Sequence, residues 1–364
     1  MAFSYTLGSI QKEREVMADQ IKVAIVGSGG WGTAAALLWA KKSDHQTSLW
    51  VPRLDAFREL QAKRENLKYL AGVPIPENIA LEHENLTCLK EAHWWVIATP
   101  AAFLDTTVTQ LRQKGIPCPP KILSLVKGMD PVTGERPSTL LARWAIHDRI
   151  VVLSGPSHAE EVARGLPASL VAASTHPELA KEIQTAMGNP LFRIYTSPDE
   201  IGVEWAGVHK NVIGIAAGIC AGLGLGDNAV SALLTRGLAE MARWGVSQGG
   251  QAETFMGLAG MGDLITTCFS PHGRNRKVGL MLASGNSIEQ IQKEMQKVAE
   301  GVNSARILHQ KAIESGVPLP ITEAVFRVIY EGVKPQIAVE QLLQRTPRSE
   351  TDFANSTDFA NSKE

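Results

Sequence analysis

Two lysines and one aspartate lie next to or within apolar segments, where a charged side chain is unusual. Lys127 directly follows the apolar run 121–126, in the segment SLVKGMD. Lys210 interrupts the small, apolar stretch WAGVHKNVIGIAAG, and Asp263 lies in the Gly-rich break GLAGMGDLITTC. A buried lysine is costly unless it reaches water or a partner, and burial moves its pKa toward the range of proton exchange near neutral pH. Lys210 is therefore a candidate for proton transfer, with a lysine that reaches solvent at a helix edge as the alternative, and Lys127 lies at the sheet edge where ligands bind.

A second set of polar residues has the chemistry of anion binding. The segment LSGPSHAEE passes through Gly155 into a predicted helix, so Ser157 either caps that helix or faces a ligand. In SPHGRNRK, Arg274 and Asn275 could bind a phosphate. The alternative for such a charge run is a solvated surface loop without a ligand. Glu300 precedes a predicted helix, where a carboxylate also suits the helix dipole.

The strongest cofactor signal is GSGGWG at 27–32, which directly follows the buried strand IKVAIV and directly precedes a helix-forming run. Gly27 permits the tight turn, Gly29 lets a pyrophosphate approach the backbone, and Gly32 lets the helix pack against the strand. The N–H groups and partial positive charge of the helix N-terminus favour phosphate. This context predicts dinucleotide binding, against the alternative of an ordinary Gly-rich βα turn.

The end of the second predicted strand bears on which dinucleotide binds. An acidic residue there would accept a hydrogen bond from a free ribose hydroxyl. The chain instead has Arg53, about twenty residues beyond Gly32, and arginine suits a 2′-phosphate. We therefore predict NADP(H), with NAD(H) as the alternative because Asp55 is close by. Arg53 could also be an ordinary solvated arginine.

Composition excludes several other classes of protein. The 364 residues carry 36 basic and 37 acidic side chains, and this balance gives no electrostatic signature of nucleic-acid binding. Four scattered cysteines without a CxxC pair predict neither disulfides nor a metal site, and they fit a reducing cytoplasm. The N-terminus lacks the apolar core of a signal peptide, and the longest apolar stretch, 211–226, is too short and Gly-rich for a membrane span.

The order of the predicted elements gives the fold class. Strand-like runs at 21–26, 47–51, 94–98, 121–126 and 150–154 alternate with helical stretches, which predicts a doubly wound parallel α/β sheet of the Rossmann type. After about residue 196 the spacing becomes helical, which predicts an all-α second domain. We expect four segments, with translation starting at Met1 or Met17: a flexible extension (1–19), the dinucleotide-binding domain (20–196), the helical substrate domain (197–346) and a disordered tail with a TDFANS repeat (347–364).

Eight segments in order make the chain resemble the bacterial-type NAD(P)-dependent glycerol-3-phosphate dehydrogenase family. They are GSGGWGTA, LVKGMD, LSGPSHAEE, HKNVIGIAAG, TRGLAEM, GLAGMGDLITTC, GRNRKVG and AEGVNSA, and the resemblance runs from about residue 21 to about 345. It implies an N-terminal Rossmann domain, a C-terminal helical domain, and interconversion of dihydroxyacetone phosphate and sn-glycerol 3-phosphate in the cleft between them. It also implies a role in supplying the glycerol backbone of phospholipids.

The resemblance assigns roles residue by residue. Lys210 matches the catalytic general acid/base, Lys127 the lysine near substrate and nicotinamide, and Asp263 the carboxylate that places both lysine and substrate hydroxyl. Gly155, Ser157, Gly273, Arg274 and Asn275 match substrate-contacting positions, the last three on the phosphate side. Beyond the glycines of the fingerprint, the positions that match cofactor contacts are Gly30, Trp31, Arg53, Lys127, Ala159, Arg274, Val298 and Glu300.

Some residues depart from the family pattern. His158 and His209 stand where an aromatic or aliphatic residue is usual, and a protonated His209 would lower the pKa of the adjacent Lys210. Gly273 replaces a more usual serine, and the segment 100–102 lacks a serine or lysine sometimes found there. None of these changes removes a residue assigned to the chemistry.

The expected reaction passes a hydride from nicotinamide to the ketone carbon while Lys210 stabilises the developing negative charge and donates a proton, without a metal. Two other functions stay open: a dehydrogenase of the same plan that acts on a hydroxy acid or an acyl-CoA, and an inactive NADP(H) sensor. The Arg274–Asn275 loop favours a phosphosubstrate over the first. The presence of Lys127, Lys210 and Asp263 together weighs against the second. A homodimer is the expectation from base rates.

Overall fold

Eight strands form one sheet in the order β3-β2-β1-β4-β5-β6-β7-β8. The computed structural model describes residues 20–145, 149–295 and 299–347. Neighbouring strands pair in parallel except β6 and β7, which are antiparallel. The strands are β1 (Ile21–Val26), β2 (His45–Trp50), β3 (Ile79–Glu82), β4 (Trp94–Ile97), β5 (Ile122–Ser124), β6 (Ile150–Ser154), β7 (Ala168–Ala173) and β8 (Phe192–Ser197). The predicted doubly wound sheet is confirmed, and it is parallel except for the β6–β7 pair.

Helices cover both faces of this sheet, which explains why its central strands are apolar without alternation. Val23 and Ile25 of β1 join the core on one face, and Ala24 and Val26 join the core on the other. The first core is covered by α2 (Gly30–Trp39), α3 (Leu54–Lys63), α7 (Ala159–Ala163) and α8 (Pro177–Met187). The second is covered by α4 (Thr87–Lys90), α5 (Leu104–Gln113), which follows the 3₁₀ turn η1 (Ala101–Phe103), and α6 (Pro137–Ala142).

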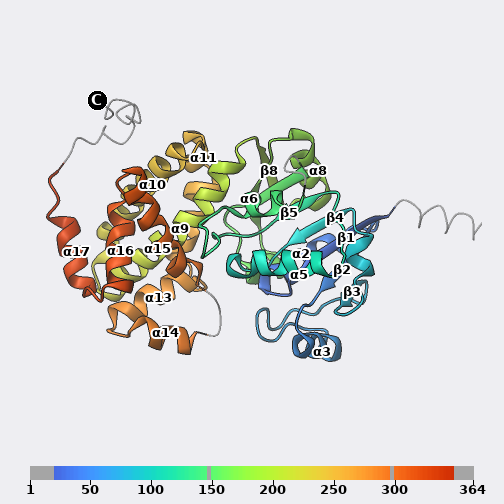
Figure 1. Ribbon diagram of the computed structural model, residues 1–364. Helices are drawn as coiled ribbons and strands as arrows, with labels where there is room; N and C mark the ends of the chain where they lie inside the picture. Colours follow the sequence, from blue (N-terminus) through green and yellow to red (C-terminus); the bar gives the residue numbers. More distant parts are fainter. Residues whose placement is uncertain (1–19, 146–148, 296–298, 348–364) are drawn as a thin grey trace, which may run out of the picture.

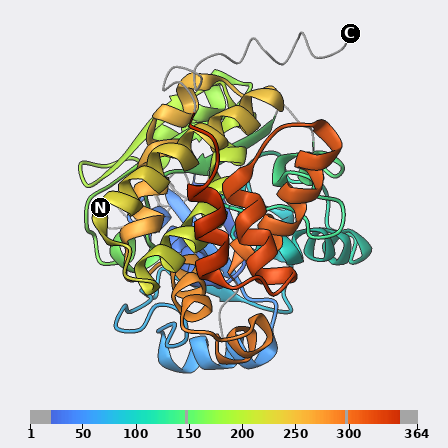
Figure 2. The ribbon, with the colours of Figure 1, turned by 90° about the vertical axis from the view of Figure 1, so that its left-hand side faces the viewer.

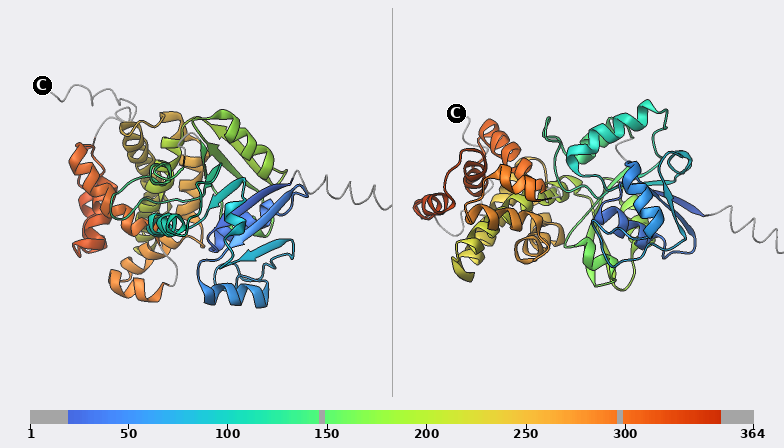
Figure 3. Two further views of the ribbon diagram at one scale, coloured as in Figure 1. Left: turned by 45° about the vertical axis from the view of Figure 1, so that its right-hand side comes forward. Right: turned by 90° about the horizontal axis from the view of Figure 1, so that it is seen from below.

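The chain beyond β8 is helical, as the spacing predicts, and these helices lie beside the sheet (Figure 1). Seen end-on they form a layer in front of the sheet, and the view from below separates the two groups (Figures 2 and 3). Their bounds are α9 (Glu200–Gly222), α10 (Gly226–Ser247), α11 (Ala252–Met256), the π-helix η3 (Leu258–Gly262), α12 (Asp263–Phe269), α13 (Arg274–Ala283), α14 (Ile288–Glu294), α15 (Glu300–Ser315), α16 (Pro320–Tyr330) and α17 (Pro335–Leu343).

Helix α9 is the element that both groups share. It packs against α10, α12, α13 and α15 on one side and reaches β6 and β7 on the other. Asp199 caps it, because its carboxylate accepts a hydrogen bond from the Gly202 N–H at 2.8 Å. Small residues let α13 approach closely: a Cβ added at Gly218 would lie 2.1 Å from the Arg276 carbonyl oxygen. No helix in the described part of the chain has the length and apolar character of a membrane span.

A buried ion pair joins α9 to α6. The Glu204 carboxylate, with a side chain 1% exposed, accepts hydrogen bonds from Arg136 Nη1 (2.6 Å), the Ser138 N–H (2.8 Å) and Ser138 Oγ (2.6 Å) at the start of α6. Such a charge is tolerated when every lone pair finds a donor. The contact therefore fixes the place of α9 relative to α6, which covers one face of the sheet.

We predict that Glu204→Ala lowers the free energy of unfolding by about 3 kcal/mol, because it leaves the Arg136 charge without its nearest partner. The matched control is Glu331→Ala, which breaks the exposed pair with Arg327 one helical turn away and should cost about 0.5 kcal/mol or less. Urea unfolding followed by circular dichroism measures both. Equal losses for the two variants would contradict a special role for Glu204.

Candidate active site

Three side chains from different elements meet in one charge cluster. Lys127, in the loop after β5, places Nζ 2.9 Å from Asp263 Oδ2. Lys210, in the middle of α9, places Nζ 2.6 Å from Asp263 Oδ1. Asp263 is 2% exposed and Lys210 is 6% exposed. The structure thus brings together the three residues that the sequence analysis singled out as charged groups in apolar surroundings.

The local sequence explains how each group reaches the cluster. Lys127 follows β5 at the carboxyl edge of the sheet, and Gly155 follows the neighbouring strand β6. Lys127 Nζ therefore also donates to the Gly155 carbonyl at 2.8 Å and lies 3.4 Å from Ser157 Oγ. The π-helix η3 ends directly before Asp263, which is the first residue of α12. Gly260 within η3 packs closely against the preceding helix, since a Cβ added there would lie 2.1 Å from the Phe255 carbonyl oxygen.

The surroundings of Lys210 and Asp263 shift the pKa of both groups. Burial lowers the pKa of Lys210 to about 8, with the neighbouring Lys127 charge acting in the same direction and Asp263 opposing it. Burial alone would raise the pKa of Asp263, but the Lys127 and Lys210 ammonium groups outweigh it and hold that pKa below its usual value. The cluster therefore contains a fixed anion and a lysine that exchanges its proton near neutral pH.

Thr267 belongs to this cluster, although sequence analysis did not single it out. Lys210 Nζ donates to its Oγ1 at 2.9 Å, and Thr267 is buried. It stands one helical turn after Asp263 on α12, so the two side chains share a face. The four-residue spacing from Asp263 is the signal that would have found it.

A chain of amides links the cluster to the phosphate-side loop. Asn211, next to Lys210 on α9, donates to the Lys127 carbonyl at 3.0 Å. Its Oδ1 accepts from Asn275 Nδ2 at 2.8 Å, and Asn275 Oδ1 accepts from the Gly301 N–H at 3.0 Å. Asn275 is buried and thus holds α9, α13 and α15 together; its predicted contact with substrate stays a prediction.

The remaining predicted phosphate-side and cofactor residues lie around this chain. Gly273 is the N-cap of α13, and Arg274 is its first residue. Glu300 opens α15, where its Oε1 accepts from the Ala101 N–H at 3.2 Å, after β4. Burial raises the pKa of Glu300, while the Ala101 N–H and the Arg274 charge oppose that shift. Val298, predicted to contact the cofactor, lies outside the described residues.

The turn after β1 has the form that a pyrophosphate requires. Gly27 has φ +111°, a conformation open to glycine, and a Cβ at Gly32 would lie 1.9 Å from the Gly27 carbonyl oxygen. A Cβ at Gly29 would meet no atom within 4 Å, so space is open in front of the α2 N-terminus. The turn therefore fits a dinucleotide phosphate.

Four other predicted cofactor residues lie within or near this turn. Trp31 Nε1 donates to the Ser157 carbonyl at 3.0 Å, which joins the turn to the loop after β6. A Cβ added at Gly30 would lie 3.5 Å from Ala159 Cβ. Arg53 stands after β2 as the N-cap of α3, and its exposed guanidinium pairs with Asp55.

The histidine beside Lys210 contacts different residues from those that Lys210 contacts. His209 Nε2 lies 3.3 Å from Glu240 Oε1 on α10 and 3.1 Å from Thr322 Oγ1 on α16. The same Glu240 carboxylate accepts from the Ile321 and Thr322 N–H groups. His209 therefore contacts α10 and α16, while Lys210 contacts Asp263 and Thr267 on α12.

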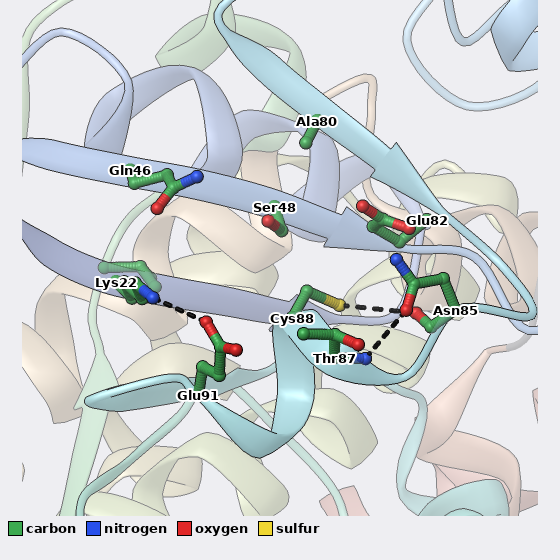
Figure 4. A pocket seen from close by; sticks show the side chains of 10 residues that line it. Lys22, Gln46, Ser48, Ala80, Glu82, Asn85, Thr87, Cys88 and Glu91 are labelled. Atoms are coloured by element: carbon green, nitrogen blue, oxygen red, sulfur yellow. Dashed lines mark hydrogen bonds and ion pairs between the residues drawn. The ribbon is translucent and has the colours of Figure 1, made fainter.

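A separate hollow lies over β1, β2 and β3, beside α4 (Figure 4). Its floor is strand backbone with polar side chains, and Lys22 pairs with Glu91 at its rim. It shares no residue with the charge cluster. Its lining residues are Lys22, Val23, Gln46, Ser48, Ala80, Glu82, Asn85, Thr87, Cys88 and Glu91.

Comparison with known proteins gives matches across the whole described fold. Residues 22–180 match the family model for the NAD-dependent glycerol-3-phosphate dehydrogenase N-terminus, and residues 199–340 match the model for its C-terminus. A glycerol-3-phosphate dehydrogenase (NAD(P)+) from Thiobacillus denitrificans is 44% identical over 331 residues, which cover 91% of this chain and all of that protein. One from Clostridium perfringens strain SM101 is 40% identical over 329 residues, or 90% of this chain and 99% of that protein.

Solved structures agree with these matches. Glycerol-3-phosphate dehydrogenase from Coxiella burnetii superposes with a TM-score of 0.85 at 35% identity, over 90% of this chain and 99% of that chain. A D-mandelate dehydrogenase solved with NADH gives a TM-score of 0.55 at 14% identity, over 86% of this chain and 98% of that chain. At that identity the second similarity concerns the fold alone.

We predict that Gly29→Ala weakens dinucleotide binding roughly tenfold or more, because the new methyl group enters the open space in front of the turn. Its stability should change by less than about 1 kcal/mol, since Gly29 has an ordinary φ of −70°. Gly32→Ala is the contrasting variant and should destabilise the fold by about 1–3 kcal/mol or more through its clash with Gly27. Fluorescence titration with NADPH and thermal unfolding separate the two effects; unchanged NADPH affinity in Gly29→Ala would contradict the assignment.

Proposed function

Since the chain belongs to the NAD-dependent glycerol-3-phosphate dehydrogenase family, we propose that Lys210 is the general acid/base of its reaction, that Asp263 holds it in place, and that Lys127 lies near substrate and nicotinamide. The chain is an oxidoreductase that interconverts dihydroxyacetone phosphate and sn-glycerol 3-phosphate with NADP(H) or NAD(H). The observation that carries the assignment is the buried contact of Lys210 with Asp263 and Thr267.

The residues of the cluster then have distinct tasks. When bound, the reduced nicotinamide supplies the hydride that reaches the ketone carbon of the substrate. Lys210, as an ammonium group, stabilises the charge that develops on the carbonyl oxygen and donates the proton. Asp263 keeps Lys210 oriented through Oδ1 and holds Lys127 through Oδ2. Lys127 adds a second positive charge beside the reacting oxygen.

Remote contacts position the reacting carbon. Gly273, Arg274 and Asn275 lie at the start of α13, where they would hold the substrate phosphate. Gly155 and Ser157 border Lys127 and would contact the substrate near the carbonyl. Binding energy from the phosphate fixes the ketone for hydride transfer, which lowers the barrier without direct contact with the reacting atoms.

NADP(H) is the proposed preferred cofactor, and Arg53 carries that proposal. Its guanidinium is exposed just after β2, where an acidic residue would otherwise favour the free ribose hydroxyl. Arg53 is paired with Asp55, so a 2′-phosphate would have to compete with that carboxylate for the guanidinium. Gly30, Trp31, Ala159, Val298 and Glu300 are the further proposed cofactor contacts.

The setting of the enzyme is also a proposal. We place it in the cytoplasm, which its four free cysteines suit, and in the supply of glycerol phosphate for phospholipid synthesis. A homodimer is favoured by base rates and by Ile265 and Phe269, two exposed apolar side chains one turn apart on α12.

Oxidation of NADPH at 340 nm with dihydroxyacetone phosphate tests the assigned chemistry. The wild-type chain should turn over rapidly, and faster with NADPH than with NADH if Arg53 binds the 2′-phosphate. Lys210→Met should keep NADPH binding and lose activity by about 10²–10⁴-fold, because the proton donor is gone. Near-normal turnover in Lys210→Met would remove Lys210 from this role.

The pKa of Lys210 predicts opposite pH profiles for the two directions. Reduction needs the ammonium form, so its kcat/KM should fall about tenfold per pH unit above about 8. Oxidation of glycerol 3-phosphate needs the neutral amine, so its kcat/KM should rise with pH and level off above about 8. In Asp263→Asn the Lys210 cation loses its anionic partner, so the break should move to lower pH. A break at the same pH in both proteins would assign it to another group.

A further inference from the structure

His158 occupies a place in the site that the assigned mechanism does not use. It stands between Ser157, whose Oγ lies 3.4 Å from Lys127 Nζ, and Ala159, which faces the dinucleotide turn. Its ring meets the ring of His272 edge-on, with centroids 5.9 Å apart and an angle of 61° between the planes. His272 directly precedes Gly273, the N-cap of α13, so His158 is next to the phosphate-side loop.

One nitrogen of this ring is buried without a partner. Among the described residues, His158 Nε2 makes no hydrogen bond, and the atom is shielded from solvent. A buried polar atom without a partner costs free energy, and such atoms in native proteins call for a reason. A ligand that brings an acceptor to Nε2 would remove that cost.

The charges around the ring determine what kind of contact it can make. The nearby ionisable groups are Lys210 on α9, Asp263 on α12, and Glu160 and Glu161 on α7. Burial and the Lys210 charge lower the pKa of His158, while the three carboxylates oppose that shift. The lowered pKa favours the neutral ring near pH 7, in which one nitrogen carries a proton and can donate a hydrogen bond to a ligand.

We propose that His158 binds the substrate phosphate, its Nε2–H donating a hydrogen bond to a phosphate oxygen. This inference rests on the proposed function and adds a specificity residue to it. The loop after β6 would thus contact the phosphate next to the start of α13. It would supply a donor where Gly273 offers no hydroxyl.

Three variants test the contact. His158→Phe keeps a ring of similar size without a donor, and His158→Gln keeps a side-chain N–H. His309→Phe is the matched control, because His309 stacks on Phe326, 4.0 Å away between centroids, in the helical part of the chain. The measurements are KM for dihydroxyacetone phosphate, KM for NADPH, kcat, and the competitive inhibition constant of inorganic phosphate.

In His158→Phe we expect KM for dihydroxyacetone phosphate and the inhibition constant of phosphate to rise about tenfold, while kcat and KM for NADPH change less than twofold. His158→Gln should recover most of the loss, and His309→Phe should match the wild type. Unchanged phosphate inhibition in His158→Phe, or a parallel rise in KM for NADPH and loss of kcat, would overturn the proposal.

A failure of the proposed function itself would look different. The wild-type chain would then not oxidise NADPH with dihydroxyacetone phosphate at all. In that case thermal unfolding with and without inorganic phosphate still decides the matter. Stabilisation that is lost in His158→Phe and kept in His158→Gln supports an anion contact at His158, and equal stabilisation of all three proteins overturns it.

Discussion

One buried carboxylate that pairs with a buried lysine and a partly buried lysine is the constraint on which the site depends. Lys210 is buried, and an unpaired buried charge costs several kcal/mol, so its ammonium form depends on a partner. Asp263 pairs with both lysines: its Oδ2 lies 2.9 Å from Lys127 Nζ and its Oδ1 lies 2.6 Å from Lys210 Nζ. Because the three residues come from the loop after β5, from α9 and from α12, the pairing also joins the sheet to the helices.

The imbalance of this cluster is the source of its chemistry. Two cations share one anion, so the site favours an anionic ligand and an oxygen on which negative charge develops. Burial, together with the Lys127 charge, leaves Lys210 with a pKa of about 8 although Asp263 opposes the shift. Asp263 raises this pKa, so without that carboxylate Lys210 would become neutral at a lower pH.

Successive residues of helix α9 connect the charge cluster to several neighbouring elements. Successive residues of a helix point about 100° apart, so His209, Lys210 and Asn211 serve three different partners. His209 contacts α10 and α16, Lys210 contacts α12, and Asn211 contacts the β5 loop and α13. Glu204, further toward the N-terminus, fixes the helix to α6. The proposed catalytic lysine is therefore carried by a helix whose side chains bond to several neighbouring elements.

The sequence by itself determined the glycine turn, the central strands and the three charged residues, because each rests on local chemistry that neighbouring residues reveal. It did not reveal β3, β7 and β8, which are short or half-exposed and acquire their form from pairing with distant strands. Only the tertiary structure decided that Thr267 joins Lys210, that Asn275 is tied to Asn211, and that His209 serves Glu240. Such contacts depend on which helix faces bury each other, and side-chain type and spacing along one chain do not determine that.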